Sequence, residues 1–478
     1  MKSRADGLVT GWTTFHLPPG IVPDGTPAVI SEGSGAGPAK LMLAQFSRPG
    51  AEGLVASLLS AGPALQARPI KKLVATLGRV GKRLLDRGDP LRAEAEARLP
   101  TECGLSHAMV QEVIDGMARE WTPERLDALL AADFPDPLVL DGFRPGPRGD
   151  LLRAVGGRFA LHVGAGNVPG VGVTSLFRSL LVKCPVLLKP GRGDIALSCL
   201  AARGIAEEDE ALASALAVVY WPGDAGGALE EVAIREADRV VAYGGPVALS
   251  RLRERIPAST PLVPYPHRVS MGVVAREALT SPGAARAVAT EAARAVAFFD
   301  QRGCVSPQAI WVEGGEKITP QEWAAFLADE LEGLAKKLPQ GSPAAAVASM
   351  VHQLRGSAEL RKAAGSGDQV FAPPRASWTV LYEPDSIPFT PCGGRTVRVR
   401  PLESLDRLPE VLYPFRGLLQ TLAVAGGEAA RSQVAEIAAA CGVTRVTTFR
   451  EQPFPPSWWR HDGQGPLLAL VRWVSLES

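Results

Sequence analysis

Residues 158–194 read RFALHVGAGNVPGVGVTSLFRSLLVKCPVLLKPGRGD, which is an apolar run, a glycine-bearing turn, a helical stretch and a second apolar run ending in another turn. Short continuous apolar runs are typical of strands buried on both faces of a parallel sheet. The rhythm continues with strands expected at 217–220 and 240–243 and a helix at 247–256. Open α/β sheets bind ligands at the carboxyl ends of their strands. We therefore assign 151–265 to the core of a Rossmann-type dinucleotide-binding domain.

The rest of the chain is expected to form three further parts. Residues 266–450 again alternate strands and helices, which predicts a second α/β unit, the catalytic domain. Residues 451–478 are expected to form a C-terminal segment with a last strand. Residues 1–150 are dense in Gly and Pro at first and then helical, which predicts a mostly helical region that packs on the cofactor domain. In that region 70–85 carries a basic stripe, either a solvated helix face or a contact for a membrane or an acidic partner.

Composition excludes several classes of function. The 478 residues include 51 Lys and Arg against 50 Asp and Glu, a formal net charge of +1 that offers no field for nucleic acid or an anionic membrane. No apolar run approaches the roughly 18 residues that span a bilayer, and the start lacks an export signal, so we expect a cytoplasmic protein. The six cysteines and six histidines show no metal-ligand spacing and no disulfide framework, which predicts no bound metal.

Cys304 is the most informative single residue. It lies in FFDQRGCVSPQ, residues 298–308, between a helix expected at 284–299 and the next strand. A thiol at such a junction can face a cleft, and a cysteine thiolate is the strongest side-chain nucleophile. The alternative is a small buried hydrophobic residue, which is the common fate of a free cysteine and the one expected for Cys184 and Cys199.

Asn167 is the candidate in the turn after the first strand, within HVGAGNVPGVG. An Asn amide at the tip of a turn can donate its N–H to a developing oxyanion. The alternative is a turn residue that tolerates left-handed geometry or caps the helix that follows.

Two further turns could bind phosphate. In LLKPGRGD a strand ends and two cations follow, and Asp194 is expected to cap the next helix. In VVAYGGP two glycines lead into a helix, where backbone N–H groups can face a phosphate. Solvated turn residues and simple helix capping are the respective alternatives. The candidate cofactor-binding residues in these turns are Lys189, Pro190, Arg192, Gly244 and Gly245.

The order of these motifs resembles the aldehyde dehydrogenase superfamily, and more closely its acyl-CoA reductase branch of the LuxC type. The matching pieces are AGNVP, VLLKPG, VAYGG, DQRGCVSPQ and the closing WWRHDGQGPLLALVRW of residues 458–473. They extend over about 155–475, whereas the first 145 residues match only loosely. The resemblance implies an aldehyde dehydrogenase-like α/β fold, with a parallel-sheet cofactor domain and an α/β catalytic domain.

The resemblance also implies roles for these residues. Cys304 would take an acyl group from a thioester, Asn167 and the backbone N–H of Cys304 would hold the oxyanion, and hydride from a nicotinamide would release the aldehyde. Lys189 would bind the adenosine ribose, with Gly244 and Gly245 over the phosphates. The implied reaction is reduction of a long-chain fatty acyl-CoA or other acyl thioester, the donor being CoA, a carrier protein or a partner enzyme. By analogy with the superfamily, we expect a homo-oligomer.

Two departures from the superfamily refine this expectation. Residues 262–270, LVPYPHRVS, replace the motif whose Glu activates a hydrolytic water, and they contain no carboxylate. Reduction is therefore favoured over hydrolysis, since a general base contributes about 10²–10⁴-fold. Arg192 stands three positions after Lys189, where NAD-preferring relatives often carry Glu, which predicts NADPH as cofactor. His461 and His267 are candidate acids or bases that stay outside the predicted site.

Two other functions are compatible with the same residues. A Cys-dependent acyltransferase or thioesterase would acylate at Cys304 without oxidising a nicotinamide. An acyl-binding scaffold in a multienzyme complex would tolerate Cys304→Ala. The retained cofactor turns favour the reductase over both.

Overall fold

The computed structural model describes residues 12–34, 37–223, 225–375, 377–385 and 389–477. The chain forms two compact units. The expected division into 1–150, 151–265, 266–450 and 451–478 remains a prediction, because the bounds of the two compact units differ from it. Unit 1 comprises residues 1–104, 118–265 and 466–478, and unit 2 comprises residues 105–117 and 266–465.

The central sheet of unit 1 has six strands in the order β11-β10-β7-β8-β9-β2. Its four inner strands are parallel to one another, which confirms the parallel sheet expected from the apolar runs. The antiparallel β2 pairs with β9 at one edge. The strands are β2 (Phe15–His16), β7 (Ala160–Val163), β8 (Val186–Lys189), β9 (Leu216–Val219), β10 (Arg239–Gly244) and β11 (Leu262–Pro266).

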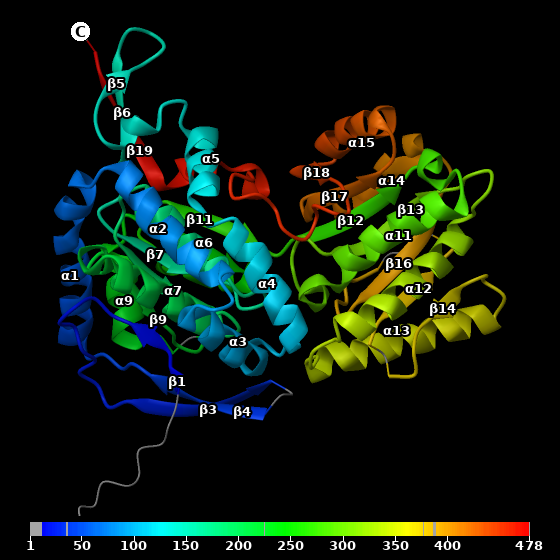
Figure 1. The fold of residues 1–478 in the computed structure, drawn as a ribbon, viewed down its shortest axis with the longest axis horizontal. Helices are drawn as coiled ribbons and strands as arrows, with labels where there is room; N and C mark the ends of the chain where they lie inside the picture. Colours follow the sequence, from blue (N-terminus) through cyan, green and yellow to red (C-terminus); the bar gives the residue numbers. More distant parts are fainter. Residues whose placement is uncertain (1–11, 35–36, 224, 376, 386–388, 478) are drawn as a thin grey trace, which may run out of the picture. The chain divides into compact units, whose positions relative to one another are not determined.

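Helices cover both faces of this sheet (Figure 1). Leu187 of β8 packs in one apolar cluster with Leu54 of α1 and Val232 of α9. Because side chains alternate along a strand, Val186 and Leu188 point to the opposite face, where α6 and α7 pack. The helices of unit 1 are α1 (Arg48–Ala67), α2 (Ile70–Leu85), α3 (Pro90–Cys103), α5 (Pro123–Asp133), α6 (Val171–Leu181), α7 (Ile195–Glu208), α8 (Glu210–Ala213), α9 (Gly227–Glu236) and α10 (Pro246–Arg255).

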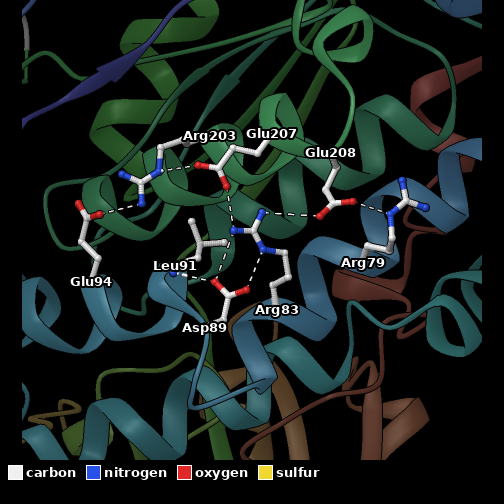
Figure 2. A network of polar contacts seen from close by, with 8 residues as sticks. All are labelled: Arg79, Arg83, Asp89, Leu91, Glu94, Arg203, Glu207 and Glu208. Atoms are coloured by element: carbon white, nitrogen blue, oxygen red, sulfur yellow. Dashed lines mark hydrogen bonds and ion pairs between the residues drawn. The ribbon is translucent and has the colours of Figure 1, made fainter.

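The basic face of α2 is matched by acidic residues within unit 1. Arg79 lies 2.6 Å from a carboxylate oxygen of Glu208, and Arg83 lies 2.9 Å from Asp89 and 2.8 Å from Glu207. Figure 2 shows these pairs joining α2 to α7 and to the start of α3. Partly exposed pairs of this kind contribute about 0–1 kcal/mol each. The solvated helix face is therefore the interpretation of residues 70–85 that the structure supports.

The first 50 residues contain strands where the sequence predicted little order. They form a three-stranded sheet in the order β1-β4-β3, in which Leu41 and Leu43 are buried. A third sheet, in the order β19-β6-β5, brings the last strand of the chain back to unit 1. The strands of these sheets are β1 (Trp12–Thr13), β3 (Ala28–Ser34), β4 (Gly37–Leu43), β5 (Arg144–Pro145), β6 (Leu151–Gly156) and β19 (Val471–Leu476).

Unit 2 is built on a seven-stranded sheet in the order β14-β15-β16-β13-β12-β17-β18, in which only β14 is antiparallel to its neighbour. Sequence analysis missed β17, although it lies inside the sheet. The strands are β12 (Val269–Val274), β13 (Pro307–Glu313), β14 (Gln369–Phe371), β15 (Thr379–Tyr382), β16 (Thr396–Leu402), β17 (Leu419–Ala425) and β18 (Arg445–Thr447).

Two apolar clusters fix the helices of unit 2 on this sheet. Helices α11 and α12 pack on one cluster with Ile310 and Val399, while α14 and α15 pack on the other with Trp311 and Leu422. Helix α4 also belongs to this unit, where Glu112 lies 3.7 Å from Arg294 of α11. The helices are α4 (His107–Arg119), α11 (Pro282–Ala297), α12 (Pro320–Lys337), α13 (Ala345–Ala363), α14 (Leu408–Leu412) and α15 (Glu428–Ala440).

Candidate functional site

The strand order of unit 1 reverses at β7. From β7 the chain proceeds to β8 and β9 on one side, and β10 then returns to the other side of β7. Ligands bind open α/β sheets at such a reversal, beyond the carboxyl ends of the strands. The turn after β7 carries Asn167, and β10 ends at Gly244. The structure therefore brings these two predicted turns to the same edge of the sheet.

The turns after β7 and β8 are in backbone contact. The N–H of Gly164 donates to the carbonyl oxygen of Lys189 at 2.8 Å. A Cβ at Gly166 would lie 2.6 Å from the nitrogen of Arg192, and one at Gly191 would lie 2.2 Å from the carbonyl carbon of Ala165. Only glycine fits at 166 and 191 without a shift of the backbone. The side chains of Asn167 and Arg192, one on each of these two turns, are exposed. Both have polar partners.

Asp194 holds the turn after β7 rather than its own helix. Its Oδ1 accepts from the N–H of Gly170 at 2.7 Å and its Oδ2 from that of Gly172 at 2.6 Å. Asp194 is the N-cap residue of α7, as expected, but its side chain forms no capping hydrogen bond to that helix. Glu102 of α3 takes that place and accepts from the N–H of Ala196 at 2.9 Å. Asp194 thus links the start of α6 to the turn that contains Lys189 and Arg192.

Asp194 predicts a specific pH dependence of stability. Its side chain is fully buried, and this burial raises the pKa from 3.8 to about 7 against the opposing effect of the two N–H donors. Between these values the folded state binds the proton more tightly than the unfolded state, so this group makes stability fall as pH rises from about 4 to 7. We expect Asp194→Asn to flatten the free energy of unfolding between pH 5 and 7 by about 1–3 kcal/mol.

Urea denaturation at each pH measures this effect. Asp209→Asn is the matched control, because Asp209 pairs with Arg68 and its pKa is lowered. That variant should keep the slope of the wild-type protein between pH 5 and 7. Parallel curves for Asp194→Asn and wild-type protein would contradict the assignment.

The remaining cofactor candidates lie at the same edge of unit 1. Lys189 is half-buried, and burial lowers its pKa, while its Nζ lies 5.7 Å from the ring centroid of Tyr220. Pro190 is buried in the turn after it. Gly245 is the N-cap of α10, and α10 begins without a side-chain cap. The structure therefore presents two cations after β8 and an uncapped helix start after β10, the two strands that flank β7.

In unit 2, Cys304 follows a sharp corner after α11. The helix ends at Ala297, before the expected residue 299, because Phe299, Asp300 and Gln301 have φ values of 56°, 50° and 63°. Such left-handed angles are rare outside glycine and require support from the surroundings. Arg395 supplies this support through an ion pair with Asp300 at 2.8 Å. Gln301 adds to it, because its side chain donates to two backbone carbonyl oxygens and accepts from the N–H of residue 396.

Cys304 lies just before β13, and the amino ends of the parallel strands β12, β17 and β18 lie beside it. Its carbonyl oxygen accepts from Ser270 Oγ at 2.6 Å. Its thiol is free and half-buried, whereas Cys184 and Cys199 are buried as expected. Burial, together with the negative charge of Asp462, raises the pKa of the Cys304 thiol to about 11, although Gln420 and two backbone N–H groups oppose this by hydrogen bonding to the sulfur. The resting thiol is therefore protonated at neutral pH.

Sequence analysis missed Gln420 and Asp462. Gln420 Nε2 donates to Asp462 Oδ1 at 3.0 Å, and Asp462 Oδ2 lies 3.4 Å from Arg268 Nε. The closing HDG block was a recognisable signal, but the residue of that block that acts on Cys304 electrostatically is Asp462, while the ring of His461 stacks on Trp459 at 4.4 Å. No sequence pattern distinguished Gln420, which lies in an ordinary apolar strand.

Other kinds of site find no support in the described part of the chain. There, no three His, Cys, Asp or Glu side chains come together as a metal site would require. Among the helices described, none combines the length and the apolarity needed to cross a membrane.

Comparison with known proteins supports the family resemblance. A model of the family described as acyl-CoA reductase (LuxC) matches residues 65–473. The long-chain acyl-protein thioester reductase of Aliivibrio fischeri is 26% identical over 339 residues, which cover 69% of this chain and 66% of that protein. The corresponding protein of Vibrio harveyi is 25% identical, with coverages of 69% and 67%. The match thus spans about two thirds of the length of these curated relatives.

Solved structures confirm the expected fold. A salicylaldehyde dehydrogenase from Pseudomonas putida G7 superposes with a TM-score of 0.74 at 12% identity, covering 98% of both chains. An NADP-dependent glyceraldehyde-3-phosphate dehydrogenase from Bacillus halodurans C-125 gives a TM-score of 0.71 at 13% identity, covering 94% of this chain and 95% of that one. These likenesses show the aldehyde dehydrogenase-like α/β fold. The match of the family model over residues 65–473 shows that the chain belongs to the acyl-CoA reductase (LuxC) family.

Proposed function

We propose that this chain reduces a long-chain fatty acyl thioester to the aldehyde through a thioester formed on Cys304, with NADPH as the reductant. The observation that carries the proposal is the half-buried thiol of Cys304, whose sulfur meets several N–H donors in a chain of the LuxC family. The named relatives are acyl-protein thioester reductases, which favours an acyl group carried by a protein, with acyl-CoA as a second donor.

The edge of unit 1 suits an anionic dinucleotide. Glycine backbones pack closely in two of its turns, Lys189 and Arg192 supply positive charge, and α10 begins without a side-chain cap. A bound nicotinamide dinucleotide supplies hydride for the reduction. Lys189, Pro190, Gly244 and Gly245 would hold its adenosine and phosphate part, and Arg192 would pair with a 2′-phosphate.

The chain's own groups account for the acyl chemistry. The Cys304 sulfur attacks the thioester carbonyl, and Asn167 with the backbone N–H of Cys304 would donate to the oxygen that becomes negative. The acyl-enzyme then persists, because residues 262–270 contain no carboxylate to activate a water molecule. Reduction to aldehyde is favoured over hydrolysis for this reason.

Product analysis tests the proposed function directly. We expect the purified chain to form one aldehyde per NADPH oxidised when it is given a long-chain acyl-CoA or an acylated carrier protein. Transfer of the acyl group without oxidation of NADPH would favour the acyltransferase or thioesterase. Neither reaction, together with acyl binding, would favour a scaffold.

Arg192 should set the choice of cofactor. We expect kcat/KM to be higher with NADPH than with NADH, and Arg192→Glu to change the ratio of the two values by about 10- to 100-fold toward NADH, because a carboxylate repels the 2′-phosphate that a guanidinium pairs with. Arg192 is exposed on its turn, so the substitution should leave the fold intact. Equal efficiency with both cofactors in the wild-type protein, or an unchanged ratio in the variant, would refute this role.

We further propose that the protein acts as a homo-oligomer in the cytoplasm. This rests on the analogy with the superfamily, on the balanced charge of +1 and on six cysteines that show no disulfide framework. Light scattering of the purified chain would test the oligomeric state.

A further inference from the structure

The side-chain amide of Gln420 lies between a buried carboxylate and the reactive sulfur. Its Nε2 donates to Asp462 Oδ1 at 3.0 Å, and hydrogen bonding by the same side chain lowers the pKa of the Cys304 thiol. Gln420 is fully buried, and the side chain of Asp462 is 2% exposed. A primary amide has two N–H donors on one nitrogen, so it can serve two acceptors at once.

Asp462 fixes which end of this amide points to the sulfur. Gln420 Oε1 is buried and has no hydrogen-bond partner among the described residues. If the amide were turned over, Oε1 would face Asp462 Oδ1, and two acceptors would meet. Arg268 compensates part of the buried charge at 3.4 Å from Asp462 Oδ2. Leaving Oε1 unpaired costs free energy, but this orientation lets both N–H groups of the amide point at acceptors.

The backbone also fixes the position of Gln420 relative to Cys304. Ser270 Oγ accepts from the N–H of Thr421 at 3.1 Å and donates to the carbonyl oxygen of Cys304 at 2.6 Å. One hydroxyl therefore joins the strand that carries Gln420 to the backbone of the nucleophile. Buried groups at the amino ends of β12, β13 and β17 therefore hold the amide of Gln420 near the sulfur of Cys304.

We propose that Gln420 is a catalytic residue that donates a hydrogen bond to the Cys304 sulfur whenever that sulfur bears negative charge, and that Asp462 is the positioning residue that holds the amide in place. The inference rests on the proposed function and deepens it. In acyl transfer the Cys304 thiol loses its proton, and its sulfur forms a bond to the thioester carbonyl carbon. The bond from that carbon to the donor's sulfur then breaks, and the donor leaves as a thiol after gaining a proton.

The same donor is needed when the aldehyde leaves. A bound reduced nicotinamide dinucleotide, the two-electron reductant, would supply hydride to the acyl carbon. The bond from that carbon to Cys304 then breaks, its electron pair stays on the sulfur, and the carbonyl of the aldehyde forms. The thiolate regains a proton from solvent. The sulfur therefore bears negative charge when it attacks the thioester and again when the aldehyde leaves, and Gln420 is in place at both points.

Several charged groups of unit 2 act in the same region. Asp462 raises the pKa of the thiol, while the Gln420 amide lowers it. Arg445 at the start of β18 interacts electrostatically with Cys304, Arg268 pairs with Asp462, and Arg302 lies two residues before the nucleophile. Since Asp462 opposes the thiolate by its charge, its benefit must come through the orientation of Gln420.

Alkylation of Cys304 tests the donor without any substrate. Gln420→Met removes both N–H groups at a similar volume, so we expect the reaction of Cys304 with iodoacetamide at pH 8 to slow about tenfold, the effect of raising the thiol pKa by one unit. The rate should be followed by mass spectrometry of the peptide that contains Cys304. Gln433→Met is the matched control, because Gln433 forms the same amide-to-carboxylate pair with Asp406, 2.7 Å apart, on the exposed surface.

A double-mutant cycle tests the positioning role of Asp462. Asp462→Gly removes the carboxylate that accepts from Gln420, and glycine tolerates the left-handed φ of 51° found there. We expect kcat for aldehyde formation to fall about tenfold for Asp462→Gly and about 10- to 100-fold for Gln420→Met. The double variant should lose no more than twofold beyond Gln420→Met alone, because Asp462 acts through Gln420. Gln420→Leu replaces Gln420→Met in both tests if the latter does not fold.

The outcomes separate this inference from the proposed function. Alkylation of Gln420→Met at the wild-type rate would overturn the donor role, even in an enzyme that forms aldehyde normally. Losses that multiply in the double variant would overturn the positioning role of Asp462. A wild-type protein that forms no aldehyde, combined with slowed alkylation of Gln420→Met, would overturn the proposed function and leave the contact between amide and sulfur supported.

Discussion

Replacing Cys304 with alanine should lower aldehyde formation by at least about 10⁴-fold, the largest effect expected of any single substitution. Loss of a catalytic nucleophile costs about this much or more in enzymes that form a covalent intermediate. No other thiol in unit 2 can replace it, since Cys392 is buried and Cys441 lies at the end of α15. The rate of NADPH oxidation with an acyl thioester measures the effect.

Cys441→Ala is the matched control for that substitution. Its thiol is half-buried like that of Cys304, but burial is the only effect that raises its pKa, with no amide or carboxylate acting on it. We expect the Cys441→Ala protein to keep the wild-type rate. Aldehyde formation by Cys304→Ala within tenfold of the wild-type rate would exclude the covalent mechanism.

Asn167→Ala should lower kcat by about 10²–10³-fold with little change in KM, because a donor to the oxyanion acts on charge that develops only in the transition state. The substitution should leave the turn intact. The turn is held by the bond from Gly164 to Lys189 and by Asp194 on Gly170 and Gly172, none of which uses the amide. Steady-state kinetics with saturating NADPH provide the measurement.

Lys189→Met serves as the contrasting variant for Asn167→Ala. A residue that binds the cofactor should change mainly the KM for NADPH, whereas the oxyanion donor should change kcat. If Asn167→Ala instead raised the KM for NADPH at an unchanged kcat, Asn167 would belong to the cofactor-binding turn alone. Asn167 is the only asparagine in the 478 residues.

The parallel sheet of unit 1 was predictable from sequence because its strands are buried on both faces. β8 is the second apolar run of residues 158–194, since VLLK is a continuous apolar run that ends at a charged residue before Pro190. The strands of the first 50 residues were not predictable in the same way. Their Gly and Pro content is typical of loops, and their pairing depends on contacts between β3 and β4 rather than on periodicity.

The candidate site was predictable where a motif carries its own chemistry. A cysteine between a helix and a strand, or cations at the end of a strand, can be recognised from neighbouring residues. Gln420 and Asp462 could not, because they lie 116 and 158 residues after Cys304 in the chain and meet it only where strand ends come together. The left-handed corner at Phe299 also depends on a distant residue, Arg395, which binds Asp300.

The most direct test of the account is the mass of the protein after incubation with a long-chain acyl thioester in the absence of NADPH. We expect one acyl group per chain, located on the peptide that contains Cys304, and its loss with formation of one equivalent of aldehyde when NADPH is added. An acyl group on another residue, or its release as free acid while NADPH remains unoxidised, would contradict the account.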